Sequence, residues 1–243
     1  MKIAFMGRSN VLFKIIEDLY DKKLHHIQFI WTSKAEKYYQ CTEIDFRNLA
    51  RKIGCSFFQG SEISDFEEKI DFKNLDLIIS INFVNIIPKS FLSKVKFGIL
   101  NAHLGDLPRY KGNACPNWAI LNEEKKIFLT IHQMSEELDS GPIFFKSSME
   151  INNQTYITEI YNWFERVSAK SFFKVIEMIE NSNKPKTQRN SRSLRTFPRK
   201  PQDSKIKWDS GVFEIHKLIR ASSRPFDGAF CFLNNDKNLK VTI

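Results

Sequence analysis

Long apolar runs and a recognisable leader are both missing from this sequence of 243 residues. No apolar run approaches the roughly 18 residues that a membrane-spanning helix needs. The opening segment, MKIAFMGRSN, carries one lysine and an apolar run of only four residues, which is too short for a signal peptide and is typical of a first strand. We therefore expect a cytoplasmic protein with no membrane insertion.

Cysteine is also sparse and forms no motif. The four cysteines, at positions 41, 55, 115 and 231, contain no CxxC pair, and the five histidines do not cluster with them. We expect reduced thiols and no metal site. The turn GRSN after the first apolar run lacks the GxGxxG spacing, which disfavours a dinucleotide-binding oxidoreductase.

Positive charge is in surplus, with 37 Lys and Arg against 28 Asp and Glu and a formal net charge of +9. Residues 184–207 hold nine of the basic residues and a single acid, Asp203. Such a surplus suits an anionic partner, such as nucleic acid, a membrane surface or a phosphorylated small molecule. Alternatively, lysine is simply the solubilising residue of a chain rich in Lys, Ile and Asn.

Apolar runs alternate with helical patterns along the first part of the chain. Strands are predicted at residues 2–6, 26–31, 55–59, 75–81, 97–103, 126–134 and 141–151, and helices at 11–23, 42–54, after Pro88, and from about 155 to 181. Thr42 and Asp45 have capping-box spacing, and Gly54 marks the end of the second helix. The alternation predicts an α/β fold: a Rossmann-like, mostly parallel sheet with helices on both faces.

The composition changes after the long helix. Residues 184–207 are polar, basic and proline-bearing, and predict a linker or extended loop. A helix at 211–222 and two strands around an NND turn follow. Because so short a tail cannot hold its own core, it must pack on the main domain or on a second subunit. We predict a main domain at residues 1–183, a linker with a helix and β-hairpin subdomain at 184–243, and a homodimer formed through the tail.

Asn101 and His103 lie at the carboxyl end of a predicted strand, where ligands bind in parallel α/β sheets. Period-two alternation places both side chains on one side, roughly 6–7 Å apart. Asp139, in the tight loop LDSGPI, could meet His103 and hold its imidazole. The alternative is that these residues have structural roles only: Asn101 caps a turn at the strand end, backbone groups bind His103, and Asp139 is part of an Asx-turn.

Three segments, LNAHLGDLPRYKG, ACPNWAI and TIHQMSEELDSGPI, together resemble the formyltransferase family that uses 10-formyltetrahydrofolate. They hold, in order, an Asn-x-His pair, a Leu-Pro-x-Tyr-x-Gly loop and an Asp-x-Gly loop. The resemblance spans about residues 1–181, and IRASSRPFDGAF is similar to the phrase that follows the catalytic domain in the tRNA and sugar branches.

The resemblance implies that Asn101, His103 and Asp139 are catalytic. Formyl transfer passes through a tetrahedral oxyanion, which the amide of Asn101 would stabilise. His103 would act as general acid and base, and Asp139 would hold His103 or an ordered water and raise the pKa of the imidazole. No metal is required. His132 is expected to be structural or to support these residues from behind.

The resemblance also implies where the ligands bind. The co-substrate 10-formyltetrahydrofolate would contact Asn85, Ile86, Ile87, Ser135, Glu136 and Leu138. The candidate substrate contacts are Arg8, Ser9 and Asn10 after the first strand, Tyr110 in a stiff, exposed loop, and Arg224 and Phe226 in the tail.

Three branches of the family compete. The methionyl-tRNA branch carries a full second barrel domain, the glycinamide ribonucleotide branch normally ends soon after the long helix, and the nucleotide-sugar branch is most similar to this chain. We therefore expect formylation of a nucleotide-linked amino-dideoxy sugar for O-antigen or other surface polysaccharide, with dTDP-4-amino-4,6-dideoxyglucose as first choice. A basic nucleic-acid-binding module without enzymatic activity is the alternative from another class, and we do not expect a nucleic-acid partner.

Overall fold

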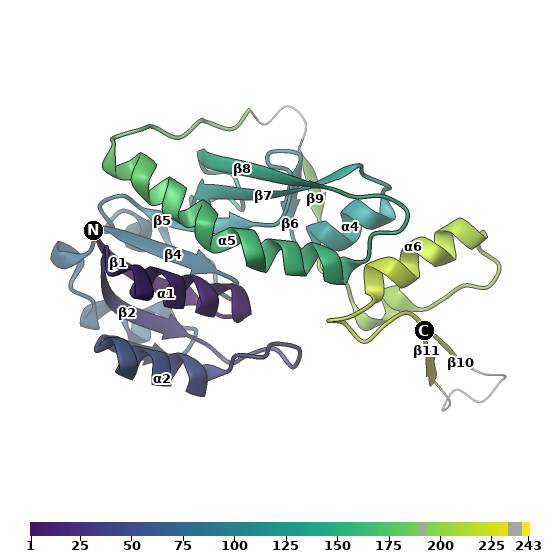
Figure 1. The fold of residues 1–243 in the computed structure, drawn as a ribbon, viewed down its shortest axis with the longest axis horizontal. Helices are drawn as coiled ribbons and strands as arrows, with labels where there is room; N and C mark the ends of the chain where they lie inside the picture. Colours follow the sequence, from purple (N-terminus) through teal and green to yellow (C-terminus); the bar gives the residue numbers. More distant parts are fainter. Residues whose placement is uncertain (190–192, 233–239) are drawn as a thin grey trace. The chain divides into compact units, whose positions relative to one another are not determined.

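The computed structural model describes residues 1–189, 193–232 and 240–243, and the chain divides into two compact units (Figure 1). Unit 1 consists of Met1–His103, Thr130–Lys146 and Glu165–Arg189. Unit 2 consists of Leu104–Leu129, Ser147–Phe164 and Asn190–Ile243. Within the described residues, no helix is both long and apolar enough to cross a membrane.

A seven-stranded sheet in the order β3-β2-β1-β4-β5-β7-β8 forms the centre of the fold (Figure 1). Its strands are β1 (Lys2–Gly7), β2 (His26–Thr32), β3 (Ser56–Gln59), β4 (Leu77–Ile81), β5 (Ile99–His103), β7 (Lys126–Gln133) and β8 (Ile143–Glu150). Strands β1 to β5 pair in parallel, and β7 runs antiparallel to β5. Every residue of β4 is buried, as expected for a strand covered on both faces. The predicted α/β fold is confirmed.

The helices begin and end largely where local signals place them. They are α1 (Asn10–Lys22), α2 (Glu43–Ile53), α3 (Lys89–Leu92) and α5 (Ile157–Glu180). The Asp45 carboxylate accepts the Thr42 N–H at 2.7 Å, which closes the predicted box before α2, and Gly54 ends that helix at φ 80°. Between β3 and β4 the chain forms three 3-10 turns, η1 (Ile63–Asp65), η2 (Glu67–Lys69) and η3 (Phe72–Asn74).

An aromatic cluster packs the core of unit 1. The Trp31 ring on β2 is fully buried, and its centroid lies 5.0 Å from that of Phe66, 5.4 Å from Phe83 and 6.4 Å from Phe91. All three contacts are edge-on, a favourable aromatic geometry. Phe83 thereby holds the segment that leads from β4 to residues 85–87.

Unit 2 contains β6 (Tyr110–Gly112), α4 (Cys115–Leu121), β9 (Leu194–Thr196), η4 (Pro201–Ser204), α6 (Val212–Ser222), β10 (Phe230–Phe232) and β11 (Lys240–Thr242). Strands β10 and β11 pair antiparallel, whereas the expected NND turn lies outside the described residues. The predicted tail helix is present as α6. The segment expected as a linker or loop, 184–207, contains β9 and η4.

The expectation of a stiff, exposed loop around Tyr110 is wrong. Tyr110 is only 3% exposed, because β6 pairs in parallel with β9 far along the chain. The residues after this loop form α4, with Pro116 in the first turn, where its missing N–H costs no helical hydrogen bond.

The tail packs within unit 2 as its small size requires. The Asn117 side chain donates to the Ala221 carbonyl at 2.8 Å. The Arg220 guanidinium, 4% exposed, donates to the Asn152 and Thr155 carbonyls at 3.0 and 2.9 Å. These bonds attach α6 to α4 and to the turn before α5.

Candidate active site

Strand β5 carries Asn101 and His103 toward the carboxyl edge of the sheet in unit 1. Its antiparallel neighbour β7 pairs His132 with Asn101 and Thr130 with His103. His103 is 7% and His132 2% exposed. Two buried imidazoles and one half-buried amide therefore meet at this edge of unit 1.

Asp139 lies between the two imidazoles. Its Oδ2 is 3.4 Å from His103 Nδ1, and its Oδ1 is 3.5 Å from His132 Nε2. The carboxylate is 9% exposed and the two rings meet edge-on, with centroids 6.3 Å apart. The carboxylate thus contacts both imidazoles at ion-pair distance.

His132 links the predicted residues to one another. The Asn101 amide donates to His132 Nε2 at 3.2 Å, and His132 Nδ1–H donates to the Gln133 carbonyl at 3.0 Å. Because the Gln133 carbonyl can only accept, the Nδ1 of His132 carries a proton. The sequence indicates a histidine on this strand but not that it faces Asn101, because the antiparallel register of β7 has no local signal.

The loop that carries Asp139 is tightly held. Asp139 adopts φ 50°, and a Cβ on Gly141 would overlap the Gln133 carbonyl oxygen. The Gln188 amide donates to the carbonyls of both Asp139 and Gly141, at 2.8 and 2.7 Å. Gln188 lies in the segment expected to be a linker, so sequence analysis missed its role. The loop fixes the carboxylate in place, and such fixed placement is what catalysis by positioned groups needs.

The residues expected to contact folate lie on two loops of unit 1. Ile86 is 85% and Leu138 50% exposed, whereas Ile87 is buried. Asn85 donates to the Ser61 carbonyl at 3.1 Å and to the Glu62 carboxylate at 3.0 Å. One loop thus has an exposed apolar side chain, Ile86, next to the hydrogen-bonded side-chain amide of Asn85.

The second loop is tied to the first. The Glu136 carboxylate lies 3.3 Å from the Lys89 ammonium, just after the Asn85–Ile87 segment. The Ser135 hydroxyl donates to the Glu137 carbonyl at 3.0 Å. The structure therefore brings all six of these residues to one neighbourhood of unit 1.

Arg8, Ser9 and Asn10 follow β1 at the same edge of the sheet. The Arg8 guanidinium donates to the Lys34 carbonyl at 2.7 Å. The Asn10 side-chain oxygen accepts the Gln40 and Cys41 N–H groups at 2.9 and 3.1 Å. Asn10 therefore holds the segment after β2, and its acceptor is already in use.

The other predicted substrate residues lie in unit 2. The Tyr110 hydroxyl accepts from Asn122 at 3.0 Å and donates to Glu124 at 2.7 Å. Burial raises the pKa of Tyr110, and hydrogen bonds from the Arg109 guanidinium lower the pKa of Glu124. Tyr110 is thus fully engaged within its own unit.

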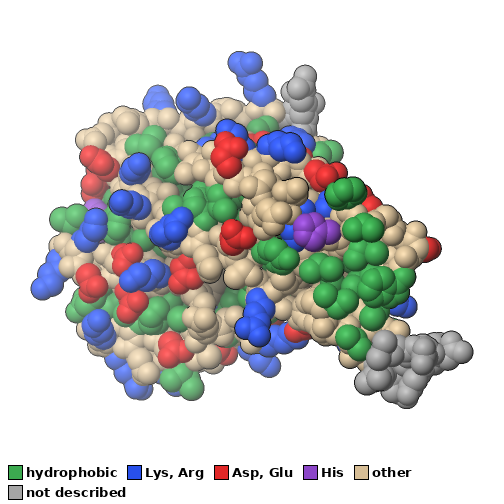
Figure 2. Space-filling view, turned by 45° about the vertical axis from the view of Figure 1, so that its right-hand side comes forward, with side chains coloured by type: hydrophobic (Ala, Val, Ile, Leu, Met, Phe, Trp, Pro, Cys, Tyr) green, Lys and Arg blue, Asp and Glu red, His purple; other side chains and the backbone are tan. Residues whose placement is uncertain are grey.

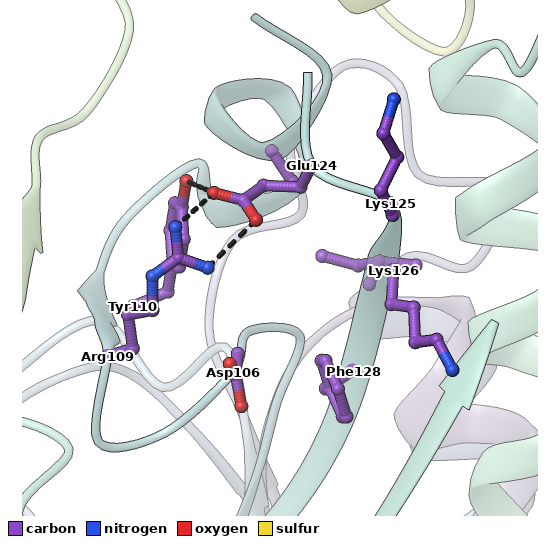
Figure 3. A pocket seen from close by; sticks show the side chains of 9 residues that line it. Asp106, Arg109, Tyr110, Glu124, Lys125, Lys126 and Phe128 are labelled. Carbon is purple, nitrogen blue, oxygen red and sulfur yellow. Dashed lines mark hydrogen bonds and ion pairs between the residues drawn. The ribbon is translucent and has the colours of Figure 1, made fainter. Parts of the chain in front are cut away.

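A small cavity of about 220 Å³ adjoins this cluster (Figure 3). Asp106, Arg109, Tyr110, Glu124, Lys125, Lys126 and Phe128 are among its lining residues. The Glu124 carboxylate faces Arg109 and Tyr110 in the close-up (Figure 3). Asn101, His103 and Asp139 do not line this cavity.

Arg224 and Phe226 also belong to unit 2. Arg224 is exposed, and its carbonyl accepts a hydrogen bond from the Thr158 hydroxyl. The Phe226 ring packs edge-on against Tyr161, with centroids 5.9 Å apart. Among the residues that the structure describes, no three His, Cys, Asp or Glu side chains are arranged to hold a metal ion.

Comparison with known proteins decides the family. The formyl transferase family model matches residues 1–176, and the model of the formyl transferase C-terminal domain matches residues 199–243. The chain belongs to the formyl transferase family. The resemblance carried by the Asn-x-His, Leu-Pro-x-Tyr-x-Gly and Asp-x-Gly segments is thereby confirmed.

Methionyl-tRNA formyltransferases are similar to this chain in sequence, and sugar N-formyltransferases are similar to it in fold. The methionyl-tRNA formyltransferase of Alkaliphilus oremlandii is 30% identical over 241 residues, which cover 96% of this chain and 76% of that protein. A 4-N formyltransferase from Francisella tularensis has a similar fold, with a TM-score of 0.77 at 19% identity over 100% of this chain and 97% of that one. An N-formyltransferase from Helicobacter canadensis, solved with folinic acid and dTDP-3-aminofucose, has a TM-score of 0.71 at 23% identity over 91% and 80%.

Proposed function

We propose that this formyl transferase moves the formyl group of 10-formyltetrahydrofolate to the amine of a nucleotide-linked amino-dideoxy sugar. The observation that carries the reaction class is the cluster that Asn101 and Asp139 form with the two buried histidines, His103 and His132, at the carboxyl edge of the sheet. An amide donor, an imidazole and a carboxylate held close together are the groups that acyl transfer requires.

Each group has a distinct task. The acceptor amine attacks the formyl carbon, and a tetrahedral oxyanion forms. The amide of Asn101 has two N–H bonds; His132 accepts one, and the other is available to the oxyanion. His103 takes the proton from the attacking amine and returns it to the folate nitrogen as the C–N bond breaks. Asp139 stabilises the imidazolium that forms in between.

The choice of a folate as the formyl donor rests on the two loops that carry the candidate folate-binding residues. An exposed Ile86 beside an anchored Asn85 suits one face and one edge of a pterin ring. The Helicobacter canadensis protein was solved with folinic acid, a formylated folate. We infer that 10-formyltetrahydrofolate binds here as co-substrate, with no metal taking part.

The acceptor is inferred from the groups that follow β1. Arg8 and Ser9 lie two strands from Asn101 along the sheet, or about 10 Å at the usual inter-strand spacing. A diphosphate near Arg8 would then leave the amino group of its hexose near His103. The Helicobacter canadensis protein was solved with dTDP-3-aminofucose, and dTDP-4-amino-4,6-dideoxyglucose is our first choice here.

Methionyl-tRNA is the second candidate acceptor. It is favoured by the 30% identity to the Alkaliphilus oremlandii methionyl-tRNA formyltransferase and by the net charge of +9. A tRNA substrate would make turnover fall steeply with salt, because each phosphate contact releases counterions.

The chain is further proposed to pair with a second copy through unit 2. Hydrophobic side chains gather on the right-hand part of the face in Figure 2. In unit 2, Trp208 is 64%, Val212 79% and Phe213 80% exposed. Such side chains are more often buried in an interface than left in water. Light scattering at micromolar concentration should give a dimer, and a monomer would rule this pairing out.

The reaction class is tested by measuring the consumption of 10-formyltetrahydrofolate by the wild type, His103→Ala and Asn101→Ala. Each substitution should lower turnover at least about a hundredfold, as loss of a proton shuttle or an oxyanion donor does. His26→Ala, which removes an exposed histidine of unit 1, is the matched control and should not change the rate. A His103→Ala variant that turns over at the wild-type rate with saturating substrate would refute the mechanism.

A further inference from the structure

The Arg8 guanidinium is already occupied by a carboxylate of its own chain. Its Nη2 lies 2.5 Å from Glu36 Oε1, and its Nη1 donates to the Lys34 carbonyl. Both side chains are partly open, at 18% exposure for Arg8 and 40% for Glu36. A solvent-accessible carboxylate therefore sits where a phosphate oxygen would pair with Arg8.

Buried donors around Arg8 remain unused. Arg8 Nε, Ser9 Oγ and Ser33 Oγ have no hydrogen-bond partner among the described residues, and Ser9 and Ser33 are 4% and 6% exposed. Arg8 and Ser33 come directly after the neighbouring strands β1 and β2, which pair at Met6 and Trp31, and Ser9 follows Arg8. Buried polar atoms without partners are uncommon, and here they accompany an arginine at the start of a helix.

Helix α1 adds its positive end to this group. It runs for 13 residues from Asn10, its first turn has no acidic residue, and Ser9 precedes it without a side-chain cap. The first N–H groups of a helix have no intrahelical acceptor, and they favour an anion. The hydroxyls of Ser9 and Ser33, the Arg8 Nε and this helix start together form an anion-binding arrangement.

The segment after β2 holds Glu36 beside Arg8. A turn closed by the Tyr39 N–H to the Glu36 carbonyl, at 3.0 Å, begins at Glu36. Asn82, after β4, donates to the Tyr39 hydroxyl at 3.0 Å, and Asn10 binds the backbone of the following residues. The segment is thus fixed to the ends of β1 and β4, which keeps the Glu36 carboxylate beside Arg8.

We propose that Glu36 is a specificity-determining residue that acts as an internal competitor for substrate phosphate at Arg8. The inference rests on the proposed nucleotide-linked substrate and adds Ser33 and Glu36 to its site. A diphosphate, with two charges to offer, displaces the Glu36 carboxylate and engages Arg8, Ser9 and Ser33. A singly charged carboxylate ligand does not, because it offers Arg8 no more than Glu36 already does.

The expected effect is modest, and its sign is the test. A partly exposed ion pair is weak, and the carboxylate also repels an incoming phosphate. Replacing Glu36 by the neutral isostere glutamine should therefore tighten phosphate binding about three- to tenfold. A residue that merely positions Arg8 would have the opposite effect, because its removal would loosen the guanidinium and weaken binding.

Calorimetric titration of the full chain with dTDP and with inorganic pyrophosphate measures this directly. Glu36→Gln should lower the Kd for both ligands, whereas thymidine should bind all variants alike. Arg8→Gln should raise the Kd, and the gain from Glu36→Gln should vanish in the Arg8→Gln background. Glu68→Gln, which removes an exposed carboxylate elsewhere in unit 1, is the charge-matched control and should leave the Kd unchanged.

The outcomes separate this inference from the proposed function. An unchanged or higher Kd in Glu36→Gln, in a protein that formylates a nucleotide-linked amine, overturns the role of Glu36 and leaves the substrate standing. Failure of both wild type and Glu36→Gln to bind either probe, together with formylation of methionyl-tRNA, overturns the inference and the proposed substrate together. Circular dichroism confirms that each variant is folded.

Discussion

Replacing Asp139 with asparagine removes the charge that faces His103 and His132 while it keeps the shape of the side chain. The carboxylate is 9% exposed, so little solvent screens its effect on the two rings. If Asp139 stabilises the imidazolium of His103, its loss should lower turnover about a hundredfold, or about 2.7 kcal/mol of transition-state stabilisation. The assay is steady-state consumption of 10-formyltetrahydrofolate with saturating acceptor.

The backbone at this position makes alanine a different perturbation. Asp139 has φ 50°, a left-handed conformation that asparagine tolerates and alanine does not. Alanine should cost about 1–2 kcal/mol of folding stability in addition to the lost charge. For a chain of this size, the Asp139→Ala variant should then melt about 2–8 °C below Asp139→Asn. An Asp139→Asn variant that is folded and retains more than half of the wild-type turnover would refute the reasoning.

Gly141→Ala should lower both melting temperature and turnover, because its Cβ would overlap the Gln133 carbonyl, whereas Gly211→Ala, where nothing lies within 4 Å, should leave turnover unchanged. Glu124→Gln should lower the melting temperature at neutral pH. The pKa of folded Glu124 is depressed by Arg109, so its stabilisation is present above the unfolded value near 4.3 and is lost as pH falls through the folded pKa; a difference from wild type that persists in stronger acid would contradict this. Burial raises the pKa of Cys41 and Cys55 to about 11, so their alkylation by iodoacetamide should still accelerate between pH 8 and 10, and a plateau in that range would contradict the burial.

Local signals account for most of the sheet and helices. The apolar runs of β1 and β4 predict strands because nearly every residue in them is buried, and the box of Thr42 and Asp45 marks the start of α2. The position of Asn101 and His103 follows from the same reasoning. Once their strand is predicted to be parallel, its carboxyl end is the expected place for a ligand-binding site.

Pairings between distant segments were not predictable in the same way. The burial of Tyr110 depends on β9, and the contact of Gln188 with the Asp139 loop depends on a segment that resembles a linker. The pairing of Asn101 with His132 depends on the reversed direction of β7. Each of these requires the three-dimensional register of two segments that no local pattern encodes. The pair of Arg8 and Glu36 is of the same kind, because it depends on where the segment after β2 folds back.

The central claim is that the cluster around His103 formylates a nucleotide-linked amine. The most direct measurement is a competition: the purified full chain is given 10-formyltetrahydrofolate with equal concentrations of dTDP-4-amino-4,6-dideoxyglucose, methionyl-tRNA and glycinamide ribonucleotide, and mass spectrometry follows the three products. The account predicts that formyl appears on the nucleotide sugar first, and that His103→Ala abolishes it. Preferential formylation of methionyl-tRNA or glycinamide ribonucleotide, over this and other nucleotide-linked amino sugars, would contradict the proposed substrate.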